Sequence, residues 1–157
     1  MHTNYGVFYP LQSFSKDLEL NFQEVPVCIE ANSKKSLEQL NLLANALSKK
    51  VYHIDSKQRK SLHLSAVFVN NFSNYMFTVA QDLCDTNNVP FEILHPLITE
   101  TALKATLQSP KNVQTGPAKR GDKETIQSHL EQLKDTKHKD VYKQLTLHIL
   151  TYYGNKL

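Results

Sequence analysis

The sequence predicts a mainly α-helical protein that begins with a small α/β portion. Short apolar runs bounded by turn-forming residues are confined to the first third of the chain, which is typical of strands. From about residue 57 onward the apolar residues recur at helical spacing. With 157 residues and 40% apolar content, the chain is long enough for one compact core, or for one core and part of another.

Runs rich in β-branched and aromatic residues predict strands at 5–9, 25–30 and 51–54. Between the second and third runs, Ser33 is a candidate N-cap for a helix whose apolar positions are Leu37, Leu40, Leu43, Ala44 and Leu47. The order strand, helix, strand predicts a right-handed βαβ crossover, and we expect a three-stranded parallel sheet. Three strands and one crossover helix are too few to cover both faces of such a sheet, so we expect that part of the fold is missing or supplied by a partner.

Residues 57–86 contain neither Gly nor Pro, which predicts one long helix. Its apolar positions make a broad stripe, and we expect the helix to be buried on most sides. They are Leu62, Ala66, Val69, Phe72, Met76, Val79 and Leu83, with Leu64, Phe68, Tyr75 and Ala80 broadening the stripe.

The remaining residues also predict helices. Asn88 and Pro90 mark a helix start, and this helix is expected to reach about residue 108 with a kink at Pro96. Residues 109–121 hold two prolines and two glycines and predict a loop. Asp122 is expected to cap a helix that reaches about residue 134, and a final helix is expected over roughly 139–153.

The composition excludes several classes of function. A net charge of +3, from 18 basic and 15 acidic side chains, is too mild to predict a nucleic-acid or membrane-surface partner. No stretch reaches the roughly 18 apolar residues of a membrane span, and two distant cysteines favour a reducing, cytoplasmic setting. None of the seven histidines has the spacing of a metal-ligand pair, so no metal site is predicted. The four glycines cannot form a G-x-G-x-x-G loop, and we expect no autonomous dinucleotide binding of the ordinary kind.

Four polar residues of the long helix form the first candidate site. Arg59, His63, Asn70 and Asn74 fall within about 60° of one another at the helical 100° per residue. One interpretation is a cleft wall, in which the histidine exchanges a proton, the amides hold substrate oxygens and the arginine holds an anion. The other is a solvated stripe, or side chains bonded to backbone groups. Both interpretations remain open.

The second candidate site is the loop T-G-P-A-K-R-G-D at 115–122. It combines glycines, two cations and a helix N-terminus, which favours an anion site formed with Thr115, Gly116 and Arg120. The structural alternative is a turn in which Asp122 caps the next helix and Arg120 pairs with a nearby carboxylate.

Three runs resemble one family in order and spacing: F-Y-P-L-Q-S-F-S at 8–15, R-K-S-L-H-L-S-A-V-F-V-N-N at 59–71, and Q-T-G-P-A-K-R-G-D at 114–122 followed by His129 and Leu130. It is the bacterial Rossmann-like family whose C-terminal half is a domain of unknown function, numbered 2520. Its members resemble pyrroline-5-carboxylate reductase, ketopantoate reductase and the hydroxyacid dehydrogenases. The resemblance implies a sheet that is a remnant of a Rossmann domain, followed by an all-helical domain like the C-terminal domain of 6-phosphogluconate dehydrogenase.

This resemblance implies roles for the residues above. It implies catalytic roles for His63, Asn70 and Asn71, substrate contacts from Arg59, Asn74, Thr115, Gly116 and Arg120, and cofactor contacts from Pro10, Gln12 and Ser13, with NADP as the cofactor. The lysine that the hydroxyacid dehydrogenases carry one turn before an asparagine is Val67 here, and His63 is the hypothesised replacement.

By the same resemblance, 1–55 are the last strands of a partial Rossmann domain, and 56–157 form the helical dimerisation and substrate domain. We therefore expect the C-terminal portion of an NADP-dependent oxidoreductase that acts on a small anionic carbonyl or imine compound. The N-terminal half of the Rossmann domain is expected to be missing, and the chain alone to be inactive. A homodimer through helix 57–86 is expected. The alternative function is a non-catalytic helical dimerisation or binding module without a cofactor.

Overall fold

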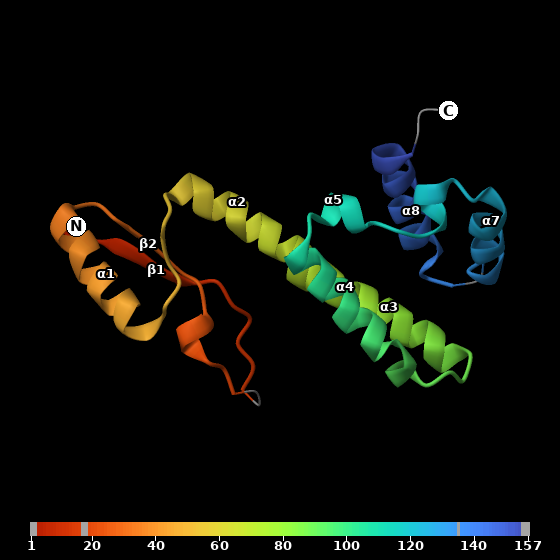
Figure 1. Cartoon of the computed structure of the whole chain (residues 1–157), viewed down its shortest axis with the longest axis horizontal. Coiled ribbons are helices and arrows are strands. Elements are labelled where there is room, and N and C mark those ends of the chain that lie inside the picture. The colour runs from red at the N-terminus through yellow and green to blue at the C-terminus, as the bar shows by residue number, and fades with distance from the viewer. Residues whose placement is uncertain (1–2, 17–18, 135, 155–157) are drawn as a thin grey trace. The chain divides into compact units, whose positions relative to one another are not determined.

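The computed structural model describes residues 3–16, 19–134 and 136–154, and Figure 1 shows the elements that they form. The chain divides into two compact units, one ending at Asn74 and the other beginning at Tyr75. The predicted fold class is confirmed, because helices dominate and a small three-stranded sheet lies near the N-terminus. The domain boundary expected between residues 55 and 56 stays a prediction.

The first unit is built on a sheet with strand order β1-β2-β3, in which β1 is Gly6–Pro10, β2 is Val27–Ala31 and β3 is Val51–His53. Strands β2 and β3 are parallel, with Val27 opposite Val51. Helix α1 (Lys34–Leu47) connects these two strands, so the predicted βαβ unit is present.

The expectation of a fully parallel sheet is wrong for the first strand. Strand β1 runs antiparallel to β2, with Gly6 opposite Ala31 and Pro10 opposite Val27. Within the described part of the connection between them, the one helical element is the 3₁₀ turn η1 (Phe22–Glu24). A parallel pair needs a crossover that carries the chain back along the sheet, usually a helix, whereas this connection returns the chain directly alongside β1.

Helix α1 covers one face of this sheet and forms the core of the unit. Val27, Ile29 and Ala44 are its buried centre, and partly buried side chains around them are Phe8, Phe22, Leu37, Leu40 and Val51. The predicted cap is confirmed, because the Ser33 hydroxyl accepts a hydrogen bond from the backbone N–H of Ser36. Burial of these apolar side chains is the main force that holds α1 on the sheet.

The predicted long helix is helical throughout, but its hydrogen-bonding pattern changes along it. Helix α2 (Ser56–Ala66) begins with a capping box between Asp55 and Gln58, and it continues into the π-helical segment η2 (Val67–Phe72) and then α3 (Ser73–Thr86). The expected burial is not present in the single chain. Large apolar side chains remain exposed along this run, at Leu64, Phe68, Val69, Phe72, Tyr75 and Phe77.

In the second unit, the 3₁₀ turn η3 (Phe91–Leu94) leads into α4 (His95–Leu107). Pro96 lies in the first turn of α4 and marks a helix start, so the expected kink is wrong. A proline is tolerated at this position because the first N–H groups of a helix have no helical partner. Asn88, the expected helix start, instead has a positive φ of 53° in the turn before η3.

The predicted loop 109–121 contains two single-turn helices, α5 (Pro110–Val113) and α6 (Pro117–Arg120). Helix α7 (Lys123–Gln132) begins with the predicted cap, in which Asp122 accepts a hydrogen bond from the backbone N–H of Thr125, and α8 (Lys139–Tyr153) follows. Ala118 and Leu133 are the buried apolar side chains of this unit among the described residues. No helix in the described ranges combines the length and the hydropathy needed to cross a lipid bilayer.

Candidate functional site

The larger of two described cavities is a cleft of about 760 Å³ in the first unit, between the end of β1 and the helical run α2–η2. Its size is within the range of small-molecule sites, and apolar groups predominate in its lining. It is lined by Tyr9, Pro10, Leu11, Gln12, Ser13, Leu62, His63, Ser65, Ala66, Val67, Val69, Asn70 and Asn71.

This cleft brings together six of the residues that the sequence selects. All three predicted catalytic residues, His63, Asn70 and Asn71, line it, as do the three predicted cofactor contacts at 10, 12 and 13. The two groups come from opposite sides of the cleft and are about fifty residues apart in the sequence. Their roles stay predictions, but the cleft supplies the proximity that those roles require.

The β1 side of the cleft is held by backbone hydrogen bonds. The Leu11 N–H donates to the carbonyl oxygen of Pro26 at 2.8 Å, which extends the pairing of β1 and β2 beyond Pro10. The Ser13 N–H donates to the side-chain oxygen of Gln12 at 2.8 Å, so this oxygen is already used locally. Gln12 and Ser13 are exposed, and their remaining polar groups are accessible to a ligand.

The helical run has a π-helical segment, η2, where Asn70 and Asn71 line the cleft. Its i→i+5 bonding widens the turn, and such segments are frequent at functional sites. The Ser73 hydroxyl follows the same pattern, because it donates to the Phe68 carbonyl oxygen five residues earlier. A regular helix places Asn70 and Asn74 on one face, whereas here the consecutive residues Asn70 and Asn71 line the cleft and Asn74 does not.

His63 makes one described hydrogen bond, between its Nδ1 atom and the phenol oxygen of Tyr9 at 3.2 Å. Tyr9 extends from β1 and His63 from α2, so this bond crosses the cleft. The sequence predicted no role for Tyr9. Strand alternation could have identified it, because Phe8 packs against α1 and its neighbour Tyr9 must then face the opposite side of the sheet.

Arg59 lies outside the lining of this cleft. Its guanidinium forms an ion pair with Glu30 at the end of β2, and a second nitrogen donates to the hydroxyl of Ser56 at 2.9 Å. Hydrogen bonds from Arg59, and next from Ser56, lower the pKa of Glu30 below its ordinary value. Arg59 therefore connects the sheet to the start of α2, and its predicted substrate contact stays a prediction.

The predicted substrate residues Thr115, Gly116 and Arg120 belong to the second unit. Gly116 precedes α6 with a φ of 104°, a conformation that favours glycine, and Thr115 is exposed. The Arg120 guanidinium lies 3.8 Å from a carboxylate oxygen of Asp122, which is a weak, exposed pair. The structural interpretation expected that Asp122 caps the next helix and that Arg120 pairs with a carboxylate, and both features are present. The ligand contacts of this loop stay predictions.

Asp122 connects this loop to α7. Its two carboxylate oxygens accept hydrogen bonds from the backbone N–H and the hydroxyl of Thr125, at 3.0 and 2.8 Å. These bonds, the backbone one first, lower the pKa of Asp122. On α7, the Nδ1 atom of His129 forms a hydrogen bond with the phenol oxygen of Tyr142 on α8, at 2.8 Å.

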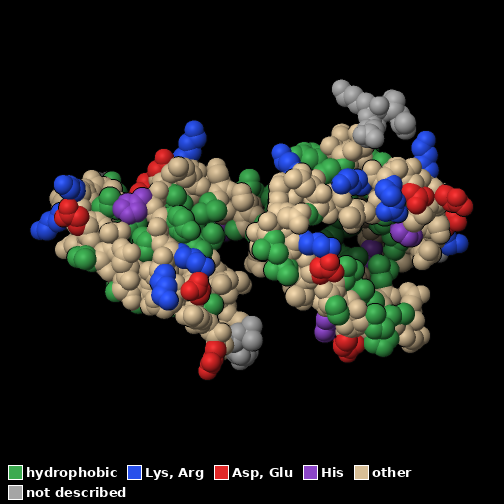
Figure 2. Space-filling view, viewed as in Figure 1, with side chains coloured by type: hydrophobic (Ala, Val, Ile, Leu, Met, Phe, Trp, Pro, Cys, Tyr) green, Lys and Arg blue, Asp and Glu red, His purple; other side chains and the backbone are tan. Residues whose placement is uncertain are grey.

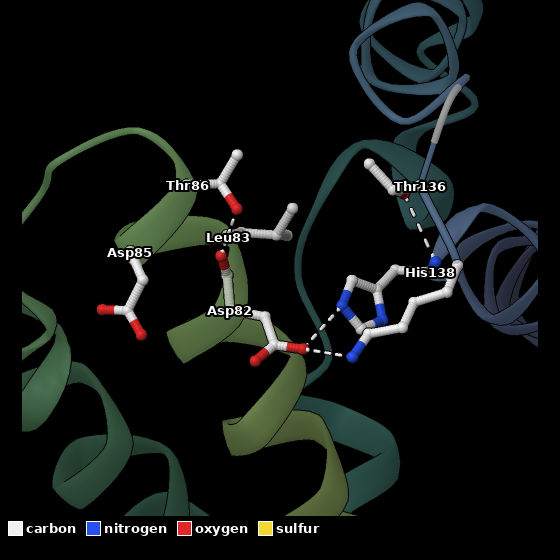
Figure 3. Close-up of a pocket in the computed structure, with 7 residues that line it drawn as sticks. Asp82, Leu83, Asp85, Thr86, Thr136 and His138 are labelled. Carbon is white, nitrogen blue, oxygen red and sulfur yellow. Dashed lines mark hydrogen bonds and ion pairs between the residues drawn. The ribbon is translucent and has the colours of Figure 1, made fainter.

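A second cavity, of about 410 Å³, lies in the second unit beside the end of α3 (Figure 3). One carboxylate oxygen of Asp82 bonds both the Nε2 atom of His138 and the Nζ atom of Lys137, each at 3.0 Å. A hydrogen bond from Lys137 is the largest of the effects that lower the pKa of Asp82. His138 is 5% exposed, and its Nδ1 atom has no hydrogen-bond partner among the described residues. This cavity contains none of the residues that the sequence selected.

A metal centre finds no support in the described ranges. There, no three side chains of His, Cys, Asp or Glu come together as ligands of one ion would. Cys28 is buried and Cys84 partly buried, both as free thiols, and burial raises the pKa of the Cys28 thiol.

A family model matches most of this chain. The model of the family described as "Domain of unknown function (DUF2520)" matches residues 25–149, and the chain is a member of that family. No curated protein matches the chain.

Two solved structures are similar to this chain. One is a Bacteroides fragilis protein provisionally named an NADP oxidoreductase, with 46% sequence identity and a TM-score of 0.89 over 94% of this chain and 57% of that protein. The other is a Thermotoga maritima protein with 23% identity and a TM-score of 0.74 over 95% of this chain and 61% of its own, and this likeness shows the fold alone. The chain thus spans less than two thirds of the length of either protein.

Proposed function

We propose that this chain is the C-terminal portion of an NADP-dependent oxidoreductase that acts on a small anionic carbonyl or imine compound. The observation that carries the proposal is the cleft of the first unit, which His63, Asn70 and Asn71 line together with residues 10–13. The similarity to the Bacteroides fragilis protein, at 46% identity, supports the same reading through that protein's provisional name. The substrate class is proposed by analogy with the reductases and dehydrogenases that the family resembles.

The described residues fit one end of a dinucleotide. The cleft has the volume and the apolar lining that a nicotinamide ring and a small substrate need, and Pro10, Gln12 and Ser13 would hold the cofactor at the β1 side. The chain offers no glycine-rich turn for the pyrophosphate, because its four glycines, at 6, 116, 121 and 154, do not have the G-x-G-x-x-G spacing. We therefore propose that the pyrophosphate contacts come from outside these 157 residues.

In this proposal each side chain has a defined task. A bound reduced nicotinamide supplies a hydride to the carbonyl or imine carbon. His63 donates a proton to the oxygen or nitrogen atom of that group, and imidazole is suited to this because it exchanges protons near neutral pH. The amide N–H groups of Asn70 and Asn71 donate hydrogen bonds to the anionic group of the substrate and hold it beside His63.

The direct test is NADPH binding and oxidation by the full-length protein, with glyoxylate, pyruvate and a cyclic imino acid as probes. We expect saturable NADPH binding and oxidation of NADPH with at least one probe. His63→Ala should lower kcat by about 10²–10⁴-fold, the usual contribution of a general acid, and leave the melting temperature nearly unchanged. Equal loss of turnover and thermal stability would make His63 a structural residue, and absence of NADPH binding would refute the oxidoreductase.

We also propose a homodimer formed through the helical run 57–86. Phe68 and Phe72 lie on the same side of this run, because their rings meet edge to face at 5.0 Å, and both are exposed. Soluble monomers seldom expose contiguous apolar patches of this kind, and a second copy of the chain is the proposed cover. Figure 2 shows hydrophobic side chains on the surface of both units.

A further inference from the structure

Tyr9 and His63 form a pair that the proposed function has not used in full. Their side chains meet at 3.2 Å although 54 residues separate them in the sequence, and both line the cleft. Tyr9 is partly buried beside the sheet, whereas His63 is exposed on the helix. The less mobile side chain of the pair is therefore the tyrosine, whose strand is fixed by five paired positions with β2.

The hydrogen bond uses one ring nitrogen of His63 and leaves the other. Nδ1 is the atom that meets the phenol, and Nε2 has no hydrogen-bond partner among the described residues. A neutral imidazole carries its proton on only one of the two nitrogens, and the bond made by one nitrogen decides which. If the phenol donates to Nδ1, the proton must be on Nε2.

We propose that Tyr9 is a positioning residue that donates its phenol proton to Nδ1 of His63 and thereby fixes the Nε2–H form of the ring. The ligand of this cleft then offers a hydrogen-bond acceptor to Nε2, which a carbonyl oxygen or an imine nitrogen does. This inference rests on the proposed function and deepens it. It assigns proton donation to the Nε2 atom of His63, and it makes the Tyr9 phenol the source of the proton that replaces the one the ring gives away.

With a carbonyl probe, each proton that is transferred has a source among these groups and water. A bound reduced nicotinamide would supply the hydride to the carbonyl carbon, and the oxygen, which gains the electron pair of the C=O π bond, would take the proton of Nε2. Nδ1 takes the phenol proton of Tyr9 in the same step, so the imidazole stays neutral throughout. The phenolate recovers a proton from water, and rotation or proton exchange of the ring restores the Nε2–H form. The nicotinamide is oxidised and the carbonyl is reduced to an alcohol.

The first test needs neither cofactor nor substrate. The ¹⁵N resonances of the His63 ring are measured at about pH 8, above the ordinary imidazole titration, in the full-length wild-type protein and in Tyr9→Phe. We expect a protonated Nε2 and a hydrogen-bonded, unprotonated Nδ1 in the wild type. In Tyr9→Phe the Nδ1 resonance should move toward the value of an unprotonated ring nitrogen that accepts no hydrogen bond. Tyr5→Phe is the matched control, because Tyr5 directly precedes β1, is 66% exposed and has no described hydrogen bond with His63. This variant should leave both ring-nitrogen resonances of His63 unchanged.

The second test separates positioning from a merely structural role. With whichever probe the wild type reduces, Tyr9→Phe should lower kcat about tenfold and leave KM within about twofold, since proton delivery and not binding is affected. Two results would contradict the proposal that Tyr9 donates to His63: a protonated Nδ1 in the wild type, or ring-nitrogen resonances that are the same in Tyr9→Phe as in the wild type. Altered resonances with unchanged kcat would overturn the proton-delivery role. NADPH oxidation with none of the probes would refute the proposed function, whereas the NMR result would still decide the pairing of Tyr9 with His63.

Discussion

Ile29 is the largest side chain at the centre of the first unit. It is 1% exposed, on β2, against α1. Ile29→Ala should lower the free energy of unfolding of this unit by about 2–5 kcal/mol, because it removes buried apolar atoms and leaves a cavity. Leu42→Ala, at a position of α1 that is 74% exposed, is the control and should change stability by less than about 0.5 kcal/mol. Chemical denaturation of both variants measures these changes in the free energy of unfolding. Similar changes in the two variants would contradict the placement of Ile29 at the centre of the core.

Asp82 makes the stability of the second unit sensitive to acid. Hydrogen bonds from Lys137 and then His138 lower its pKa in the folded state below the ordinary value of 3.8. The carboxylate therefore stabilises the fold above about pH 4, and this contribution is lost as the pH falls through the lowered pKa. Asp82→Asn should make the melting temperature of this unit fall less steeply as the pH is lowered below about 4.

Asp85→Asn is the control for this prediction. Asp85 is exposed and lines the same cavity, but it makes no described ion pair. Its replacement should leave the acid dependence as it is in the wild type. An equal change in both variants would show that general charge, and not the Asp82 pairing, sets the dependence.

Local residue roles were predictable from sequence, whereas the Tyr9–His63 contact was not. Ser33 and Asp122 were predicted as caps because a cap depends on a few neighbouring residues, and both are confirmed. The bond between Tyr9 and His63 depends on how β1 and α2 lie in space. Helical spacing also grouped Asn74 with Asn70; Asn70 lies in the π-helical segment and lines the cleft, whereas the substrate contact of Asn74 stays a prediction.

At the scale of elements, the cap of α1 can be tested separately from its packing. Ser33→Ala removes the acceptor of the Ser36 N–H and should lower stability by about 1 kcal/mol, a typical loss for an N-cap. Ser61→Ala, an exposed position within α2, should change stability by less than about 0.5 kcal/mol. Thermal unfolding of the two variants makes the comparison, and an equal loss would mean that the Ser33 bond does not matter.

Element types followed from periodicity, but directions and irregularities did not. The βαβ unit was predictable because a helix between two strands brings the chain back parallel. The direction of β1 depends on the connection to β2, whose described residues, 11–16 and 19–26, form no crossover helix, and no residue pattern there indicated it. Pro96 could either kink a helix or begin one, and its place next to η3 decides for the beginning.

At the scale of the whole molecule, exposed apolar surface is the feature that the single chain leaves unexplained. The stripe on 57–86 was expected to be buried, yet Leu64, Phe68, Phe72 and Tyr75 are exposed. Further large apolar side chains are exposed on α4, at Leu97, Leu103 and Leu107. Removal of such surface from water is worth roughly 25 cal/mol per Å², so an association that covers it is favoured.

The proposed homodimer gives the last prediction. Light scattering on the wild-type protein should give twice the mass of one chain, and Phe68→Asp should give the mass of one chain. The reason is that position 68 is 60% exposed in the monomer, so a carboxylate there loses its water only when the dimer forms. Leu42→Asp introduces the same charge on α1, outside 57–86, and should remain dimeric. A wild-type mass of one chain at high concentration would refute the dimer, and dissociation by both variants would place the interface elsewhere. A dimer that only Phe68→Asp dissociates would mean that the helical run around η2 is covered by a second copy, next to the cleft that Asn70 and Asn71 line.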